Sequence, residues 1–400
     1  MQHASSLRLT HVTTSHVARL HLAGRDHALD GLRGLVMALM VLDHARDFFL
    51  GYRVHPLDLA TTTPLLFATR WITHFCAPVF VFCAGVAAYL YGEKRGAAER
   101  TRFLLSRGAF LVLLEVTLIR LLWIPDPFYR FTLLQVIWVI GWSMMALAAL
   151  SHLPRGWLAL VGGLLVVGHN AFDGVHAAHF GALAPLWNLL HERARLSLAP
   201  GHVVFVSYPL VPWLGVMALG YAFGPVIELS AEQRRALCFR LGIGLTLGFL
   251  ALRGLNLYGD PTPWTAQPAP LFTVLSFLNC EKYPPSLDYL LMTLGPALLV
   301  LGSVSFSAPW LRFAVVFGQV PLLFYVLHLF LLRVVSLPVA VARFGGLALA
   351  PPPTGTGASP ELPLPFTYLA WAVTLLLLYP VCRWYARLKA TRRSSWLRYL

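Results

Sequence analysis

Charged residues are scarce in this chain, and their scarcity argues against a soluble protein. Asp, Glu, Lys and Arg make up 12% of the 400 residues, whereas hydrophobic residues make up 58%. The mean hydropathy is +0.67. In soluble globular domains about a quarter of all residues are charged, so we expect an integral membrane protein.

Cysteine is also scarce, and its spacing argues against two kinds of scaffold. No Cys-x-x-Cys pair occurs, so we expect neither a disulfide framework nor a zinc site, and no metal cofactor. We interpret Cys76 and Cys83 as small apolar fillers within a helix. Cys280 is interpreted as a lone thiol in an outer loop, and the remaining two are Cys238 and Cys382.

Two further absences narrow the function. We find no convincing internal repeat, which weakens the case for an inverted-repeat transporter. No basic module stands apart from the apolar segments, although Lys and Arg number 31 against 17 Asp and Glu. This excess therefore indicates topology and contact with anionic lipid, and we expect no nucleic-acid partner.

What the chain does contain is a series of apolar stretches long enough to cross a bilayer. They predict an all-α, polytopic helix bundle with about ten transmembrane helices. The expected spans are residues 30–50, 67–92, 104–124, 130–151, 155–170, 203–226, 236–257, 285–305, 316–341 and 364–388.

Basic residues predict how this bundle is oriented. They cluster in the 93–107 loop, in the 227–240 loop and in the C-terminal tail. With ten spans and both termini inside, all three clusters face the cytoplasm, as the positive-inside rule prefers. We therefore divide the chain into a cytoplasmic N-terminal segment without an evident signal-peptide cleavage pattern (1–28), a transmembrane domain (29–388) and a basic cytoplasmic tail (389–400).

The first span carries the most informative polar residues. Arg33 and His44 are eleven residues apart, which places them on one helix face, ~16 Å apart along the axis. Asp30 precedes Arg33 by one turn on the same face. Ionisable groups at membrane depth mark a site or a pathway by default. Arg33 with Asp30 suits a phosphorylated ligand at the inner mouth, although Arg33 could instead snorkel to lipid phosphates.

Two more histidines are candidates for proton transfer at the outer side. His55 falls in the first outer loop, and His74 lies in the Trp71–Pro78 stretch of the second span. Together with His44 they could supply a general base or a proton relay. The alternative is that His55 and His74 are interfacial residues bound to backbone groups.

The outer loops 51–66, 171–202 and 258–284 are longer and richer in Pro, Trp, His and Asn than the inner loops, which suggests that function lies outside. Four outer residues are our candidates for binding the acceptor or for donating a hydrogen bond to the oxyanion of the reaction: Asn256, Asn279, Tyr283 and Trp213.

An ordered set of motifs resembles a known family. Asp30-Gly-Leu-Arg-Gly34 with His44, the Trp71–Gly85 stretch, Tyr208–Gly215, Tyr283–Ser286 and Pro321–His328 are similar to bacterial membrane proteins related to the catalytic domain of heparan-α-glucosaminide N-acetyltransferase. The spacing of Arg33 and His44 also resembles that of membrane acyltransferases that O-acetylate surface glycans.

This resemblance implies acyl transfer across the bacterial cytoplasmic membrane. Acetyl-CoA would bind from the cytoplasm, with Arg33 and Asp30 as its site, and a sugar or glycan acceptor would bind outside. In the lysosomal enzyme an asparagine occupies the place of His44 and the catalytic histidine matches His55, so the resemblance leaves open which of the two is the base. A homodimer is also left open. The rival hypothesis is a small-molecule or glycan-precursor transporter without acyl transfer.

Overall fold

The computed structural model describes residues 27–51, 55–306, 308–349 and 359–392. The N-terminal segment and the basic tail that the sequence predicts lie largely outside these residues. About 75% of the structure is helical. The helices are α2 Ala28–Phe49, α3 Pro64–Trp71, α4 Cys76–Arg95, α5 Ala97–Leu114, α6 Arg120–Trp123, α7 Val136–Leu150, α8 Arg155–Gly168, α9 Ala184–Leu190, α10 Leu210–Phe223, α11 Ala231–Leu255, α12 Pro270–Leu278, α13 Leu287–Ser303, α14 Arg312–Gln319, α15 Pro321–Phe344 and α16 Leu364–Thr391.

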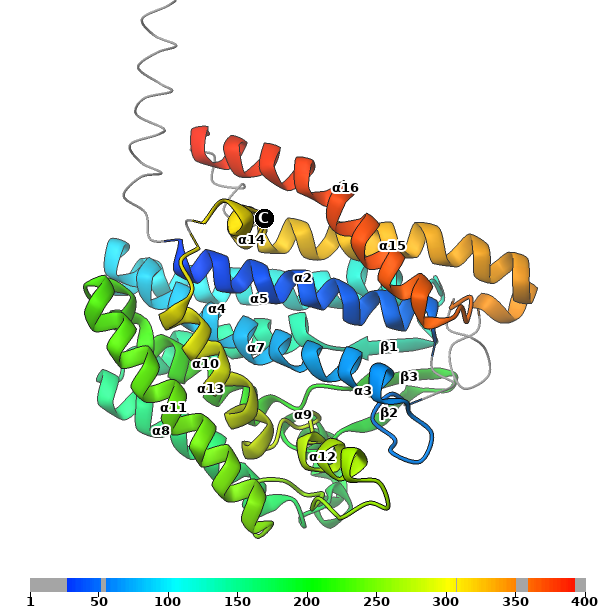
Figure 1. Cartoon of the computed structure of the whole chain (residues 1–400), viewed down its shortest axis with the longest axis horizontal. Coiled ribbons are helices and arrows are strands. Elements are labelled where there is room, and N and C mark those ends of the chain that lie inside the picture. Colours follow the sequence, from blue (N-terminus) through cyan, green and yellow to red (C-terminus); the bar gives the residue numbers. More distant parts are fainter. Residues whose placement is uncertain (1–26, 52–54, 307, 350–358, 393–400) are drawn as a thin grey trace, which may run out of the picture.

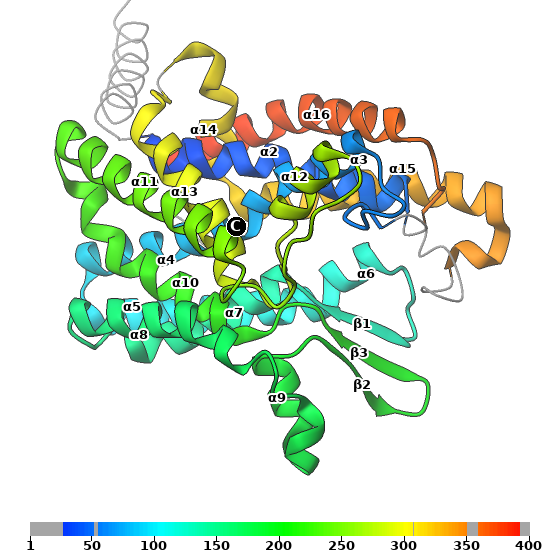
Figure 2. The same ribbon diagram turned by 60° about the horizontal axis from the view of Figure 1, so that its bottom comes forward.

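A small sheet corrects the all-α prediction. Its strands are β1 Phe131–Leu134, β2 Ala194–Ala199 and β3 His202–Val206. β3 is central, parallel to β1 with Phe131 opposite Val203, and antiparallel to β2. Figure 2 shows the sheet projecting at one end of the bundle, near α6 and α9.

Two expected spans are consequently shorter as helices than the hydropathy suggests. The 130–151 and 203–226 spans each begin with a strand, and the helix follows only at Val136 and Leu210. The strand segments are short and rich in β-branched and aromatic residues, which favour strands. A short apolar run does not by itself distinguish strand from helix.

Helices long and apolar enough to cross a membrane number five in the described residues. A sixth arises if the bent pair Arg155–Phe172 and Ala177–Leu190 counts as one span. The two shorter apolar helices are α7 and α13. The five are Pro64–Arg95, Leu210–Glu228, Ala231–Leu255, Pro321–Leu349 and Leu364–Thr391.

Helix α2 is the central element of the bundle. It packs against α4, α14, α15 and α16, and most of its side chains are buried (Figure 1). At Gly34 an added Cβ would lie 1.6 Å from the carbonyl oxygen of Ala314, and at Gly318 it would lie 1.8 Å from that of Asp30. Only glycine permits this approach, so α14 lies directly against the first turns of α2.

Polar caps fix the loops that enter the bundle from the sheet side. Thr63 caps α3 by accepting a hydrogen bond from the N–H of Leu66. Ser286 caps α13 by accepting from the N–H of Tyr289, and its hydroxyl donates to Asp260 at 2.6 Å. These bonds satisfy helix-end N–H groups and hold the loop before α13 in place.

The three basic segments of the sequence lie toward one end of the bundle. The α4–α5 turn, the start of α11 and the C-terminal end of α16 are all at the left of Figure 1, beside the start of α2. The sheet lies toward the opposite end. The molecule therefore has a basic end and a sheet end, and α2 runs from the first toward the second.

Candidate functional site

A large cavity follows helix α2. Its volume is about 2120 Å³, and its lining includes Asp30 and Arg33 in the first turns of α2 and Asp43 and His44 near the last turn. At ~1.5 Å per residue, positions 30 and 44 are ~21 Å apart. The α4 wall leaves room because it is built largely of small side chains: Cys76, Ala77, Ala84, Ala87 and Ala88.

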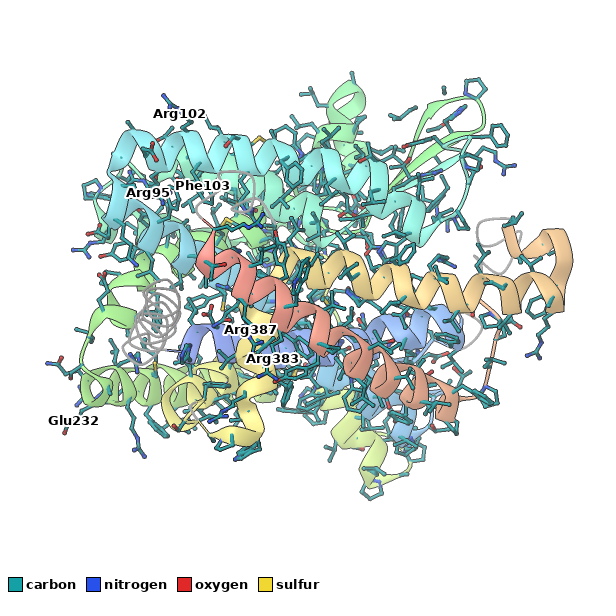
Figure 3. All side chains as sticks on the ribbon, turned by 90° about the horizontal axis from the view of Figure 1, so that it is seen from above. Arg95, Arg102, Phe103, Glu232, Arg383 and Arg387 are labelled. Carbon is teal, nitrogen blue, oxygen red and sulfur yellow. The ribbon has the colours of Figure 1, made fainter. Side chains whose placement is uncertain are left out.

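Cations dominate the basic end of this cavity. Eight of them come from α2, α5, α11, α14 and α16, and we call them the basic mouth: Arg33, Arg107, Arg234, Arg235, Arg312, Arg383, Arg387 and Lys389. Figure 3 shows Arg383 and Arg387 on the C-terminal half of α16. Asp30 is the one carboxylate among the described residues that line this end. Such a cluster favours a ligand with several negative charges, phosphates above all.

Arg33 is held in position within the basic mouth. Its Nη1 lies 3.6 Å from the Asp30 carboxylate and donates to the carbonyl of Gly318 at 3.1 Å. The guanidinium is therefore fixed between α2 and α14 by contacts that occupy only part of its five N–H donors.

The other end of the cavity contains a pair of hydrogen-bonded histidines. The distance from His44 Nδ1 to His328 Nε2 is 2.6 Å, and both rings are buried. The interplanar angle is 15° and the ring centroids are 4.9 Å apart. These values fit rings joined edge to edge through their nitrogens.

The backbone decides which nitrogens carry protons. His328 Nδ1 lies 3.0 Å from the carbonyl oxygen of Phe324, which can only accept, so Nδ1 of His328 is the protonated nitrogen. When His328 is neutral its Nε2 is an acceptor, and His44 Nδ1–H must donate to it. In this arrangement Nε2 of a neutral His44 carries a free lone pair, as a general base requires.

Aromatic rings hold the His44 imidazole from the sides. Trp123 meets it edge-on with centroids 4.9 Å apart, and Tyr325 does so at 6.1 Å. Trp123 is fixed in turn because Arg333 donates to the carbonyls of Leu122 and Trp123.

An ion network lies directly beside His44. Asp43 accepts two hydrogen bonds from Arg70 Nη1, at 2.8 and 2.7 Å. Arg46 Nη2 approaches Asp43 at 3.0 Å and Asp47 at 2.5 Å. The carboxylates of α2 are thus paired, which reduces the cost of burying them.

The structure places the three histidines expected from the sequence in different surroundings. His44 lines the cavity. His55 is exposed and does not line it, and His74 is fully buried behind it with neither ring nitrogen hydrogen-bonded to a described residue. The ring of His74 packs against that of Tyr289, with centroids 5.3 Å apart. His44 alone of the three is brought together with Arg33 and Asp30.

The four expected acceptor residues are also separated. Asn256 is exposed, and its side-chain amide pairs with the backbone of Trp264. Asn279 donates to the carbonyl of Leu57 at 3.1 Å. Trp213 is fully buried, and its indole N–H has no partner among the described residues. Only Tyr283 comes close to the ion network, with its hydroxyl 3.4 Å from Nη2 of Arg70.

Sequence reasoning missed His328, Lys282 and Tyr325 as components of the site. His328 and Tyr325 fall inside the Pro321–His328 motif and Lys282 directly precedes the Tyr283–Ser286 motif, but nothing in their spacing relates them to a residue on the first span. Lys282, Tyr208 and Tyr325 line the same cavity as His44. Across the described part of the chain, no group of three or more His, Cys, Asp or Glu side chains is placed to hold a metal ion.

These features define a class: a helical membrane protein with a cavity that joins a cluster of cations at one end to a buried pair of histidines at the other. The chain belongs to the heparan-alpha-glucosaminide N-acetyltransferase catalytic family, whose sequence model matches residues 25–258. Membership implies a membrane protein with acetyltransferase-type function. The match includes Arg33 and His44 but ends before Lys282 and His328. No curated protein matches the chain.

Proposed function

We propose that this protein transfers an acetyl group from acetyl-CoA to a sugar or glycan acceptor on the other side of the bacterial cytoplasmic membrane. The observation that carries the proposal is the single cavity that joins the basic mouth to His44. The basic mouth suits the phosphates of CoA, and the surroundings of His44 suit the thioester. The ~16 Å between Arg33 and His44 fits the pantetheine arm that separates the two.

The basic end faces the cytoplasm in this proposal, and the sheet end faces outward. The positive-inside rule supports this orientation because the α4–α5 turn, the start of α11 and the end of α16 are all basic. A ten-span topology with both termini inside is consistent with it. Acetyl-CoA then enters from the side on which it is made.

The transfer needs one base and one stabilised oxyanion. His44 Nε2 removes the proton from the acceptor hydroxyl or amine, which attacks the thioester carbonyl carbon. The resulting oxyanion needs a donor, and the Tyr325 hydroxyl is buried there with no hydrogen-bond partner among the described residues. When the carbon–sulfur bond breaks, the imidazolium of His44 returns the proton to the CoA sulfur.

The test is acetyl transfer by the purified protein. We would incubate it in detergent with radiolabelled acetyl-CoA and a panel of amino sugars and glycan precursors. His44→Ala should lower the rate by about 10²- to 10⁴-fold, which is the contribution of a general base. His202→Ala, at an exposed position of β3, is the matched control and should leave the rate unchanged.

Two outcomes would contradict the proposal. Near wild-type transfer by His44→Ala would exclude His44 as the base, and loss of transfer in His55→Ala instead would assign that role to His55. Sugar movement across proteoliposomes without any acetyl transfer would favour the transporter hypothesis.

A further inference from the structure

Lys282 is a buried cation at the His44 end of the cavity, opposite the basic mouth. It lies in the loop between α12 and α13, is 5% exposed and lines the same cavity as His44. Its Nζ lies 6.0 Å from the ring centre of Tyr208 and 5.2 Å from that of Tyr283. No described residue forms an ion pair or hydrogen bond with this ammonium. Burying an unpaired charge is unfavourable, so this ammonium favours a ligand group that carries a negative charge.

The nearest carboxylates on α2 are already engaged. Asp43 is paired with Arg70 at 2.7 Å and with Arg46 at 3.0 Å, and Asp47 is paired with Arg46 at 2.5 Å. These four charges cancel, and Lys282 is left as the excess positive charge of the cluster.

Glu281 precedes Lys282 but does not neutralise it. Its Oε1 accepts the backbone N–H groups of Lys282 at 3.0 Å and of Tyr283 at 2.8 Å. Burial raises the pKa of the Glu281 carboxyl above its usual range. Its role is to shape the loop that presents Lys282.

The negative charges of acetyl-CoA do not reach Lys282 in the proposed binding mode. The phosphates of CoA lie at the basic mouth, ~16 Å from His44 along α2. The part of acetyl-CoA that reaches His44 is an uncharged thioester. A negative charge beside Lys282 must therefore come with the acceptor.

Further cations surround Tyr283, the residue that follows Lys282. The guanidinium of Arg193 lies 5.0 Å from the ring centre of Tyr283, on a loop leading into β2. Burial raises the pKa of the Tyr283 hydroxyl, but the charges of Lys282 and Arg70 lower it below its usual range. At His55, burial and the charges of nearby arginines lower the pKa. Clustered positive charge of this kind attracts anionic groups.

We infer that Lys282 binds an anionic group of the acceptor, a carboxylate or a phosphate, and so holds the acceptor hydroxyl or amine beside His44. This inference rests on the proposed function, and it names the substrate class: acidic sugars or glycans rather than neutral ones.

The experiment compares matched neutral and anionic acceptors. Glucosamine is paired with glucosamine 6-phosphate, and glucose with glucuronic acid, so that phosphate and carboxylate are tested separately. Lys282→Met should raise KM at least tenfold for the anionic member of the preferred pair and leave the neutral member unchanged. Lys282→Arg should restore part of the difference. Lys94→Met, at an exposed position, is the matched control.

Binding without chemistry separates this inference from the proposed function. Calorimetric titration of the same sugars into the protein without acetyl-CoA should give tighter binding of the anionic sugar, lost in Lys282→Met. If transfer is absent but this loss is seen, the acidic-ligand site stands and the acetyltransferase proposal fails. A lower kcat for neutral and anionic acceptors alike, or no preference for anionic sugars in binding, overturns the inference.

Discussion

His44 differs from a solvent-exposed histidine because both its tautomer and its ring orientation are set by other residues. The carbonyl of Phe324 fixes the protonated nitrogen of His328, and His328 fixes that of His44. A base is most effective when the correct nitrogen is free and correctly aimed. In the proposed mechanism His328 is therefore a positioning residue, which acts on the acceptor only through His44.

Replacement of His328 tests this role. His328→Ala leaves the Nδ1–H of His44 without its acceptor, and we expect kcat to fall by about 5- to 100-fold, the cost of an unsatisfied buried donor. The KM for acetyl-CoA should not change because the basic mouth is intact. His328→Gln keeps one acceptor and one donor and should recover part of the rate. Steady-state kinetics of both variants measure the effect.

A purely structural role for His328 would give a different result. The loss of thermal stability in each variant would then parallel its loss of kcat. His328→Gln would recover no more of the rate than His328→Ala. Equal kcat in His328→Ala and wild type would also contradict the positioning role.

At this scale the sequence predicts relations within one helix but not between helices. Helical periodicity places Asp30, Arg33 and His44 on one face, and the structure has all three lining one cavity. His44 and His328 are 284 residues apart, and no local pattern encodes their contact. The burial of Lys282 is not visible in the sequence either, because it depends on the contact with Tyr208, 74 positions earlier in the chain.

Elements were more predictable than contacts, for a physical reason. Each expected span contains a helix, since apolar length is a strong signal. The strands β1 and β3 were missed because four or five apolar residues next to a long helix extend the apolar run without a visible boundary. Their pairing is non-local, with residue 131 opposite residue 203.

The close approach of α2 and α14 gives a prediction at the scale of elements. In Gly34→Ala the new methyl would overlap the carbonyl oxygen of Ala314, at 1.6 Å, so the helices must separate. We expect a loss of about 1–3 kcal/mol of stability, typical of overpacking. Weaker acetyl-CoA binding should accompany it, since Arg33 bonds to Gly318 across the same contact. Thermal unfolding in detergent and a binding titration measure the two effects.

Gly244→Ala is the matched control for this prediction. Gly244 lies within α11, and nothing lies within 4 Å of an added Cβ. Alanine is favoured over glycine in a helix by up to about 1 kcal/mol, so this variant should be as stable as wild type or slightly more stable. Unchanged stability and binding in Gly34→Ala would mean that α14 moves away at no cost.

On the scale of the whole molecule, the net charge of +14 is distributed unevenly, and the distribution organises the site. The basic mouth collects cations from five helices that are distant in sequence. The same residues satisfy the positive-inside preference and create a field for a polyanionic ligand. In the proposed function, topology and ligand binding are therefore coupled: the orientation that places the basic end inside also places the mouth where acetyl-CoA is available.

Removal of two charges from the mouth tests this coupling. The double variant Arg383→Gln with Arg387→Gln changes two cavity-lining residues on α16, and Arg102→Gln removes one exposed charge at the same end that does not line the cavity. We expect the double variant to raise the Kd for acetyl-CoA by about tenfold, as two partly screened charge contacts of about 0.7 kcal/mol each would. Arg102→Gln should have little effect.

Salt dependence provides the decisive contrast. Screening weakens exposed charge interactions as the Debye length falls from about 10 Å at 0.1 M salt to about 3 Å at 1 M. Wild-type affinity should therefore fall with salt more steeply than that of the double variant, and the two should converge at high salt. kcat at saturating acetyl-CoA should stay the same in both, because the charges bind the nucleotide end and His44 acts at the other. Parallel salt curves would place the CoA phosphates elsewhere.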